Sequence, residues 1–152
     1  LSIPVIGAGG VGDGRGMAAM VCLGAKGVQV GTRFLLADEC VCHENYKEKI
    51  VKAKDIDTVI TGNITGHPVR VLKNALANEF LKIEKELYKE ENPDLSKLES
   101  VGTGALRRAV VEGDVKNGSV MAGQIAGLTD KRESCKDIIE DIYNGHLKVL
   151  NK

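Results

Sequence analysis

Several features that would point to a charged or lipid partner are missing from this sequence of 152 residues. Lysine plus arginine and aspartate plus glutamate number 21 each, so the formal net charge is zero. Nucleic acids and anionic membranes attract basic surfaces, so neither is an expected partner. The sequence contains no apolar run of the roughly 18 residues that a membrane-spanning helix needs. We therefore expect no nucleic-acid partner and no membrane segment.

Cysteine, the aromatic residues and metal-binding patterns are also sparse. Tryptophan is absent, and the four cysteines stand at positions 22, 40, 42 and 135. They form no C-x-x-C pair, and no spacing of histidine and cysteine matches a zinc site. The first ten residues lack the charged segment that begins a signal peptide. The sequence therefore predicts no metal site and a reduced, cytoplasmic setting.

Glycine, by contrast, is abundant, and two glycine-rich turns are the most informative feature. Residues 3–10 read IPVIGAGG and residues 27–33 read GVQVGTR, so each turn follows a short apolar run. Residues 14–23 between them have the composition of a helix, and Gly24 is a helix stop signal. The pattern predicts two buried parallel strands joined by a helix. Bare N–H groups at the same edge of two such strands can hold one phosphate, as in the last strands of a (β/α)₈ barrel.

Two other interpretations of the glycine turns stay open. Residues 7–12 also match G-x-G-x-x-G, the turn of dinucleotide-binding Rossmann folds. That fold places an acidic residue at the end of the second strand, where this sequence has Gly31-Thr32-Arg33. Arg33 could instead contact a 2′-phosphate. In the third interpretation the glycines only make tight turns between strand and helix.

The rest of the chain has mainly helical patterns. Residues 57–61 favour a short extended piece, and helices are predicted over residues 44–54, 69–91 and 95–112, the last of them interrupted by Gly102-Thr103-Gly104. A last helix is expected to begin at Asp130, with Glu133 completing a capping box.

This organisation does not supply a whole barrel. A (β/α)₈ barrel needs eight strand–helix units and about 250 residues, whereas this chain has one such unit and begins within a predicted strand. We therefore predict an α/β fold, the C-terminal part of a TIM barrel with its last β-α-β unit, carrying a mainly helical insertion and a C-terminal helix. The expected division is barrel strands and helix at 1–44, insertion at 45–115, and a return segment with the last helix at 116–152.

The glycine turns also carry a family resemblance. Residues 3–14 (IPVIGAGGVGDG) and 23–34 (LGAKGVQVGTRF) resemble the flavin-dependent nitronate monooxygenase (nitropropane dioxygenase) family. Three later stretches are similar to its FMN-dependent enoyl-acyl-carrier-protein reductase II branch: residues 43–50, 66–74 and 118–127. The resemblance covers essentially the whole chain.

The resemblance implies roles for individual residues. The FMN phosphate would be held by Gly9, Gly10, Gly31 and Thr32, with Gln29 beneath it. Residues 121–124 would return to the flavin ring, and the resemblance then assigns Met121 and Ala122 to the substrate and Gln124 to the cofactor. The family's catalytic histidine would come from the N-terminal half of the barrel, outside this chain.

The implied activity is reduction of an enoyl thioester on acyl carrier protein, with NAD(P)H as reductant and FMN as cofactor. The first alternative is oxidation of nitronates with FMN and O₂, and the second is a phosphate- or nucleotide-binding module without catalysis. A monovalent cation is left open as a further ligand. Because a missing N-terminal half would leave apolar barrel surface uncovered, we also expect a homodimer.

Overall fold

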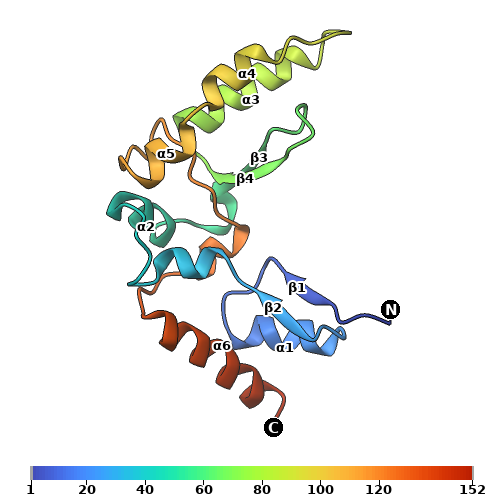
Figure 1. The fold of residues 1–152 in the computed structure, drawn as a ribbon, viewed down its shortest axis with the longest axis vertical. Coiled ribbons are helices and arrows are strands. Elements are labelled where there is room, and N and C mark those ends of the chain that lie inside the picture. Colours follow the sequence, from blue (N-terminus) through green and yellow to red (C-terminus); the bar gives the residue numbers. More distant parts are fainter. Residues whose placement is uncertain (1, 152) are drawn as a thin grey trace.

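The computed structural model describes residues 2–151 as an elongated molecule (Figure 1). One end holds the first two strands with the first and last helices, and the other end holds a β-hairpin with two helices. The helices and strands are β1 (Ile6–Ala8), α1 (Gly14–Cys22), β2 (Gly27–Gln29), α2 (Glu44–Val51), β3 (Thr58–Thr61), β4 (Val69–Leu72), α3 (Ala75–Leu87), α4 (Ser96–Gly102), α5 (Ala105–Val110) and α6 (Cys135–Val149). Short 3₁₀-helices include η1 (Thr32–Leu36), η2 (Asp55–Asp57) and η3 (Gln124–Leu128).

The predicted β-α-β unit is present at the N-terminal end. Strands β1 and β2 are parallel, with Ile6 opposite Gly27 and Ala8 opposite Gln29. Asp13 caps α1 by accepting the backbone N–H groups of Arg15 and Gly16. The strands are shorter than expected, and β1 is exposed rather than buried, because the sheet has only two strands here and leaves Ile6 54% exposed.

Helix α6 packs along α1, and the start of α6 differs from the prediction. Gly14 and Gly145 let the two backbones approach closely, since a Cβ on Gly14 would lie 2.4 Å from the Gly145 carbonyl carbon. The cap of α6 is Ser134, whose side chain accepts the backbone N–H of Asp137. The capping box at Asp130 and Glu133 was therefore wrong, because the Glu133 carboxylate pairs with Arg33 instead.

The middle of the molecule is held by its largest apolar cluster. Leu36 of η1, Ile50 of α2 and Leu72 of β4 are completely buried there, together with Val120 of the return segment. Because these residues are far apart in sequence, their burial fixes the return segment against η1, α2 and the hairpin.

The insertion is less helical than predicted. A single helix over residues 69–91 was expected, but residues 69–72 form β4, which pairs antiparallel with β3, and α3 begins only at Ala75. The β-branched Val69 and Val71 favour a strand. Asn74 then starts α3 by accepting the Ala77 N–H with its side chain. The expected extended piece at residues 57–61 is confirmed as β3, and a break between the later helices is confirmed between α4 and α5.

Candidate functional site

The carboxyl ends of β1 and β2 bring the two glycine turns together. Gly9 and Gly10 follow β1 directly, while Gly31 and Thr32 follow β2 after one further residue. Because Ala8 and Gln29 are paired in parallel register, both turns leave the sheet at the same edge. This is the arrangement that the sequence predicted for a phosphate site.

The backbone of the turns is exposed to a ligand. Gly9 and Gly10 have φ values of +89° and +72°, in the region that favours glycine, and a Cβ on either would meet no atom within 4 Å. Gly31 likewise faces open space. Within residues 2–151, the N–H groups of Gly9, Gly10, Gly31 and Thr32 have no backbone acceptor. Four free N–H donors beside bare backbone suit an anionic group such as a phosphate.

Thr32 adds a side-chain donor and connects the turn to the return segment. Its hydroxyl oxygen accepts the Gly123 N–H at 2.9 Å, and the residue is buried. A hydroxyl that accepts this bond still has its own hydrogen to donate. Thr32 can therefore hold residues 121–124 in place and contact a phosphate oxygen at the same time.

A hollow of about 400 Å³ opens beside the first turn. Its lining includes Gly10, Gly12 and Gly16, together with Ile125 and Leu128 of the return segment. The return segment thus contributes to the lining of this hollow through Ile125 and Leu128, and the placement of residues 121–124 at the flavin ring stays a prediction.

Asp13 and Arg15 stand at the mouth of this hollow. Burial raises the pKa of Asp13, but hydrogen bonds from Arg15 and Gly16 outweigh it, so the pKa lies below its usual value. The carboxylate stays ionised and occupies the Arg15 and Gly16 amides of α1. An anion would consequently be held by the glycine turn and not by the first turn of α1.

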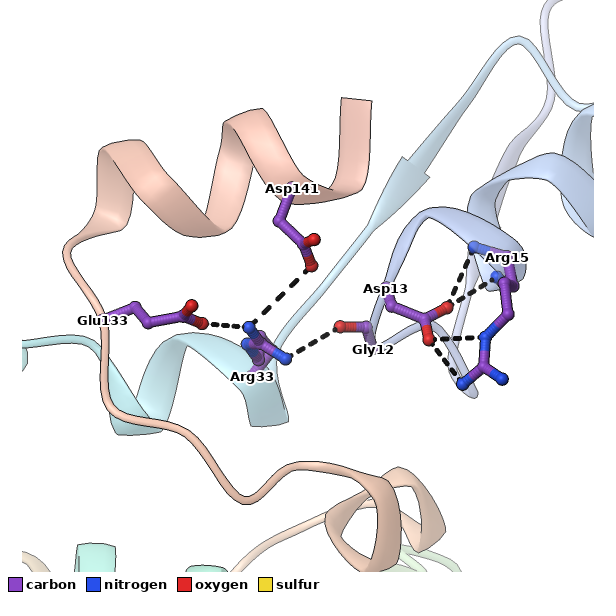
Figure 2. Close-up of polar contacts among 7 residues, drawn as sticks. Gly12, Asp13, Arg15, Arg33, Glu133 and Asp141 are labelled. Carbon is purple, nitrogen blue, oxygen red and sulfur yellow. Dashed lines mark hydrogen bonds and ion pairs between the residues drawn. The ribbon is translucent and has the colours of Figure 1, made fainter. Parts of the chain in front are cut away.

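The Arg33 side chain links the first glycine turn to the segment around the start of α6 (Figure 2). Its side chain is buried, and it donates to the Gly12 carbonyl at 3.4 Å and to the Glu133 carboxylate. Asp141 of α6 lies 3.9 Å from the same guanidinium. One arginine after β2 therefore fixes the turn after β1 and the segment that leads into α6. Its Nε is buried without a partner among residues 2–151.

The comparisons with known proteins agree with this geometry. The family model described as nitronate monooxygenase matches residues 1–145. The chain belongs to the nitronate monooxygenase family. The family and the chain's neighbours within it are FMN-dependent oxidoreductases.

Three relatives illustrate the match. The structure of FabK, an enoyl-acyl-carrier-protein reductase II, from Thermotoga maritima has 48% identity and a TM-score of 0.89, covering 99% of this chain and 46% of that one. A probable nitronate monooxygenase of Staphylococcus saprophyticus is 37% identical, covering 100% of this chain and 41% of that protein. Nitroalkane oxidase from Streptomyces ansochromogenes is 28% identical with a TM-score of 0.74, covering 99% of this chain and 41% of that one. The chain thus spans a little under half the length of these relatives, which have TIM-barrel folds.

Membership of the nitronate monooxygenase family agrees with what Arg33 does in the structure. The Rossmann interpretation needed this residue to be free for a 2′-phosphate. Its guanidinium is instead buried against Glu133 and the Gly12 carbonyl. That interpretation is therefore wrong for this chain.

The donor set fits the phosphate of FMN, the cofactor of the nitronate monooxygenase family. The unpartnered N–H groups of the two turns and the Thr32 hydroxyl are neutral donors at one edge of the sheet. Gln29 and Gln124, the other two residues that the resemblance assigned to the cofactor, have exposed side chains. Their assignment to the cofactor stays a prediction.

The two residues that the family resemblance assigned to substrate lie in different surroundings. Met121 lines a cavity between the hairpin and α3, whereas Ala122 is buried in the central apolar cluster. The main chain here extends the hairpin, since the Ala122 N–H donates to the Arg70 carbonyl at 3.3 Å and Met121 bridges to Val71. The substrate roles of Met121 and Ala122 remain predictions.

Tyr46 is a contact residue that the sequence did not reveal. Its hydroxyl, on α2, donates to the Met121 carbonyl at 2.8 Å. Burial raises the pKa of Tyr46 to about 12, so the hydroxyl keeps its proton at neutral pH. A contact over 75 residues has no local signal that a single sequence could show.

The three histidines do not assemble into a reaction centre. His43 caps α2, because its Nδ1 accepts the Asn45 N–H. His67 lines the cavity beside the hairpin, and His146 is buried in α6. In the described part of the chain, no group of three or more histidine, cysteine or acidic residues is placed to hold a metal ion. Among the described helices, none has the length and apolar character to cross a bilayer.

Proposed function

We propose that the protein serves FMN-dependent reduction of an enoyl thioester carried on acyl carrier protein, with NAD(P)H as reductant. The observation that carries this proposal is the similarity to FabK of Thermotoga maritima, with 48% identity over 99% of this chain. Bound FMN would supply hydride transfer from NAD(P)H to the β-carbon of the enoyl group.

The residues of this chain act by binding and orientation. The N–H groups of Gly9, Gly10 and Gly31 would bind the FMN phosphate, and Thr32 would donate its hydroxyl hydrogen to the same group. Thr32 also fixes Gly123, while Tyr46 fixes Met121. Their combined effect is to hold the return segment at a set distance from the phosphate. A flavin bound there would therefore lie beside a return segment that is already held in position.

We further propose that residues outside this chain supply the catalytic histidine and most of the flavin-ring pocket. Two facts support this. The relatives are about twice as long. The N-terminal end of the chain also leaves apolar side chains uncovered: Ile3 before β1 is 68% exposed, Ile6 in β1 54% and Leu23 at the end of α1 84%. An N-terminal barrel half would cover this surface, and a homodimer is the further assembly that we expect.

Nitronate oxidation is the second candidate, supported by the family model and by the relative from Staphylococcus saprophyticus. The same phosphate site would serve both reactions. The deciding experiment supplies the complete enzyme with NADH and a crotonyl thioester, and separately with a nitronate under O₂. NADH consumption with the thioester supports the reductase. Oxygen uptake with the nitronate and no NADH-dependent reduction would replace it with the oxidase.

The Thr32 hydroxyl offers a specific test of the phosphate site. We expect Thr32→Val to weaken FMN binding about tenfold or more, because one hydrogen bond to a charged group contributes about 1.5–3 kcal/mol. Thr32→Ser should keep most of the affinity. Thr58→Val is the matched control, since it removes a hydroxyl that bonds Arg70 in the hairpin. Equal FMN dissociation constants for Thr32→Val and Thr58→Val, measured by flavin fluorescence, would contradict the assignment.

A further inference from the structure

An apolar cavity of about 190 Å³ lies between the β3–β4 hairpin and α3. These elements lie at the end of the molecule away from the β-α-β unit (Figure 1). Its apolar walls come from the hairpin, the helices and the return segment. They include Val69, Val71, Leu76, Phe80, Leu106 and Met121.

No lysine, arginine, aspartate or glutamate lines this cavity. Two of its polar side chains are already satisfied within the protein. Asn74 donates to the carbonyls of Val115 and Gly118 and accepts from Ala77, while Thr65 donates to the Gly62 carbonyl. Because His67 is the one ionisable side chain among its described lining residues, the cavity disfavours charged groups such as the diphosphate of a nicotinamide cofactor, which would lose most of its hydration there.

Neighbouring residues of the return segment border the cavity and the phosphate site. Met121 lines the cavity, and Gly123, two residues further on, donates its N–H to Thr32. Both contacts are held in place, since Tyr46 bonds the Met121 carbonyl and Met121 bridges to Val71. A ligand whose reacting end lies near the flavin could extend its apolar end past Met121.

We propose that this cavity binds the aliphatic chain of the acyl thioester and limits the acyl group to about six carbons. The proposal rests on the reductase function proposed above. An apolar cavity of about 150 Å³ accommodates benzene, so a cavity of about 190 Å³ suits a chain of six or seven carbons. Because the walls carry no lysine, arginine or carboxylate and are mainly apolar, they favour an aliphatic chain over an ionic part of the substrate.

Gly102 allows a test that fills the cavity. It lies at the end of α4 and lines the cavity, and a Cβ there would make an ordinary contact with Phe80 at 3.5 Å. A larger side chain at 102 would therefore extend toward Phe80, with no left-handed backbone to strain. Ser100→Leu is the matched control, because Ser100 is exposed on the same helix.

The probe is the uncharged thioester S-hexanoyl-N-acetylcysteamine, titrated by calorimetry into the protein. We expect Gly102→Leu to weaken its binding at least tenfold and Ser100→Leu to leave it unchanged. The unsubstituted protein should bind the hexanoyl thioester at least tenfold more tightly than the acetyl or dodecanoyl thioester. That series tests the size limit even if Gly102→Leu fails to fold.

Two outcomes would overturn the proposal: an affinity that rises steadily to the dodecanoyl thioester, or unchanged hexanoyl binding in folded Gly102→Leu. FMN binding, measured on the same samples, separates this proposal from the proposed function. Loss of chain-length selectivity with intact FMN binding would refute only the proposal that the cavity binds the acyl chain. Selective hexanoyl binding without any FMN binding would refute the flavin function and leave an apolar-chain site.

Discussion

Replacing Arg33 with methionine is expected to lower the free energy of unfolding by about 3 kcal/mol and to weaken FMN binding at least tenfold. Methionine keeps much of the buried volume but removes the partner of Glu133 and the donor to the Gly12 carbonyl. Breaking a buried ion pair by removing one partner typically costs about 3–5 kcal/mol. We expect a loss of stability at the lower end of this range because the Glu133 side chain is 29% exposed and can regain some hydration.

The FMN effect follows from the position of Gly12. This residue closes the turn that begins at Gly9, and Arg33 is the side chain that holds its carbonyl. Without that bond the turn is free to shift, so its N–H groups no longer converge on one anion. Arg15→Met is the matched control, because Arg15 pairs with Asp13 at the surface, where such pairs contribute about 0–1 kcal/mol.

Chemical denaturation and an FMN titration of both variants decide this prediction. If Arg33→Met matched Arg15→Met in both measurements, Arg33 would have no structural or positioning role. If it were destabilised but bound FMN normally, the ion pair would support the fold alone and the link to the phosphate turn would be wrong.

Replacing Gly10 with alanine is expected to reduce FMN affinity at least tenfold, with a modest loss of stability. Its φ of +72° costs an L-residue about 1–2 kcal/mol. There is space for the added methyl group, since no atom lies within 4 Å of its position. The backbone can relieve the strain only by rotating, and rotation turns the N–H groups away from the phosphate.

Gly24→Ala separates strain from function. Gly24 ends α1 with a φ of +99°, also beside open space, but it lies outside the two phosphate turns. We expect the two alanine variants to lose similar stability, with FMN affinity falling only for Gly10→Ala. Parallel FMN titrations and thermal melts measure both quantities. An equal change in FMN affinity in the two variants would mean that the first turn does not contact the phosphate.

The sequence predicts the features of this fold that have local signals. Gly9 and Gly10 are needed for the turn itself, and Gly24 ends its helix, so the β-α-β unit is predictable from its own residues. The hairpin is not, because Val69 and Leu72 fit both a strand and the apolar stripe of the helix that follows. Only the pairing with β3, which is not local, decides between the two.

The contacts that hold the site in place have no such signal. Arg33 and Glu133 are 100 residues apart, and Gly123 and Thr32 are 91 apart. In one sequence, Glu133 looks like a helix-capping residue and Arg33 like a phosphate ligand. Their pairing depends on α6 packing along α1, and that depends in turn on the close approach at Gly14.

The central claim, that the two glycine turns bind the phosphate of a flavin, is tested most directly by comparing FMN with riboflavin. The two ligands share the flavin ring and differ in the phosphate. Because several N–H donors and the Thr32 hydroxyl would lose their acceptor with riboflavin, we expect FMN to bind about 100-fold more tightly or better. We also expect Gly10→Ala to reduce the ratio of the riboflavin dissociation constant to the FMN dissociation constant. Equal affinity for FMN and riboflavin would contradict the claim.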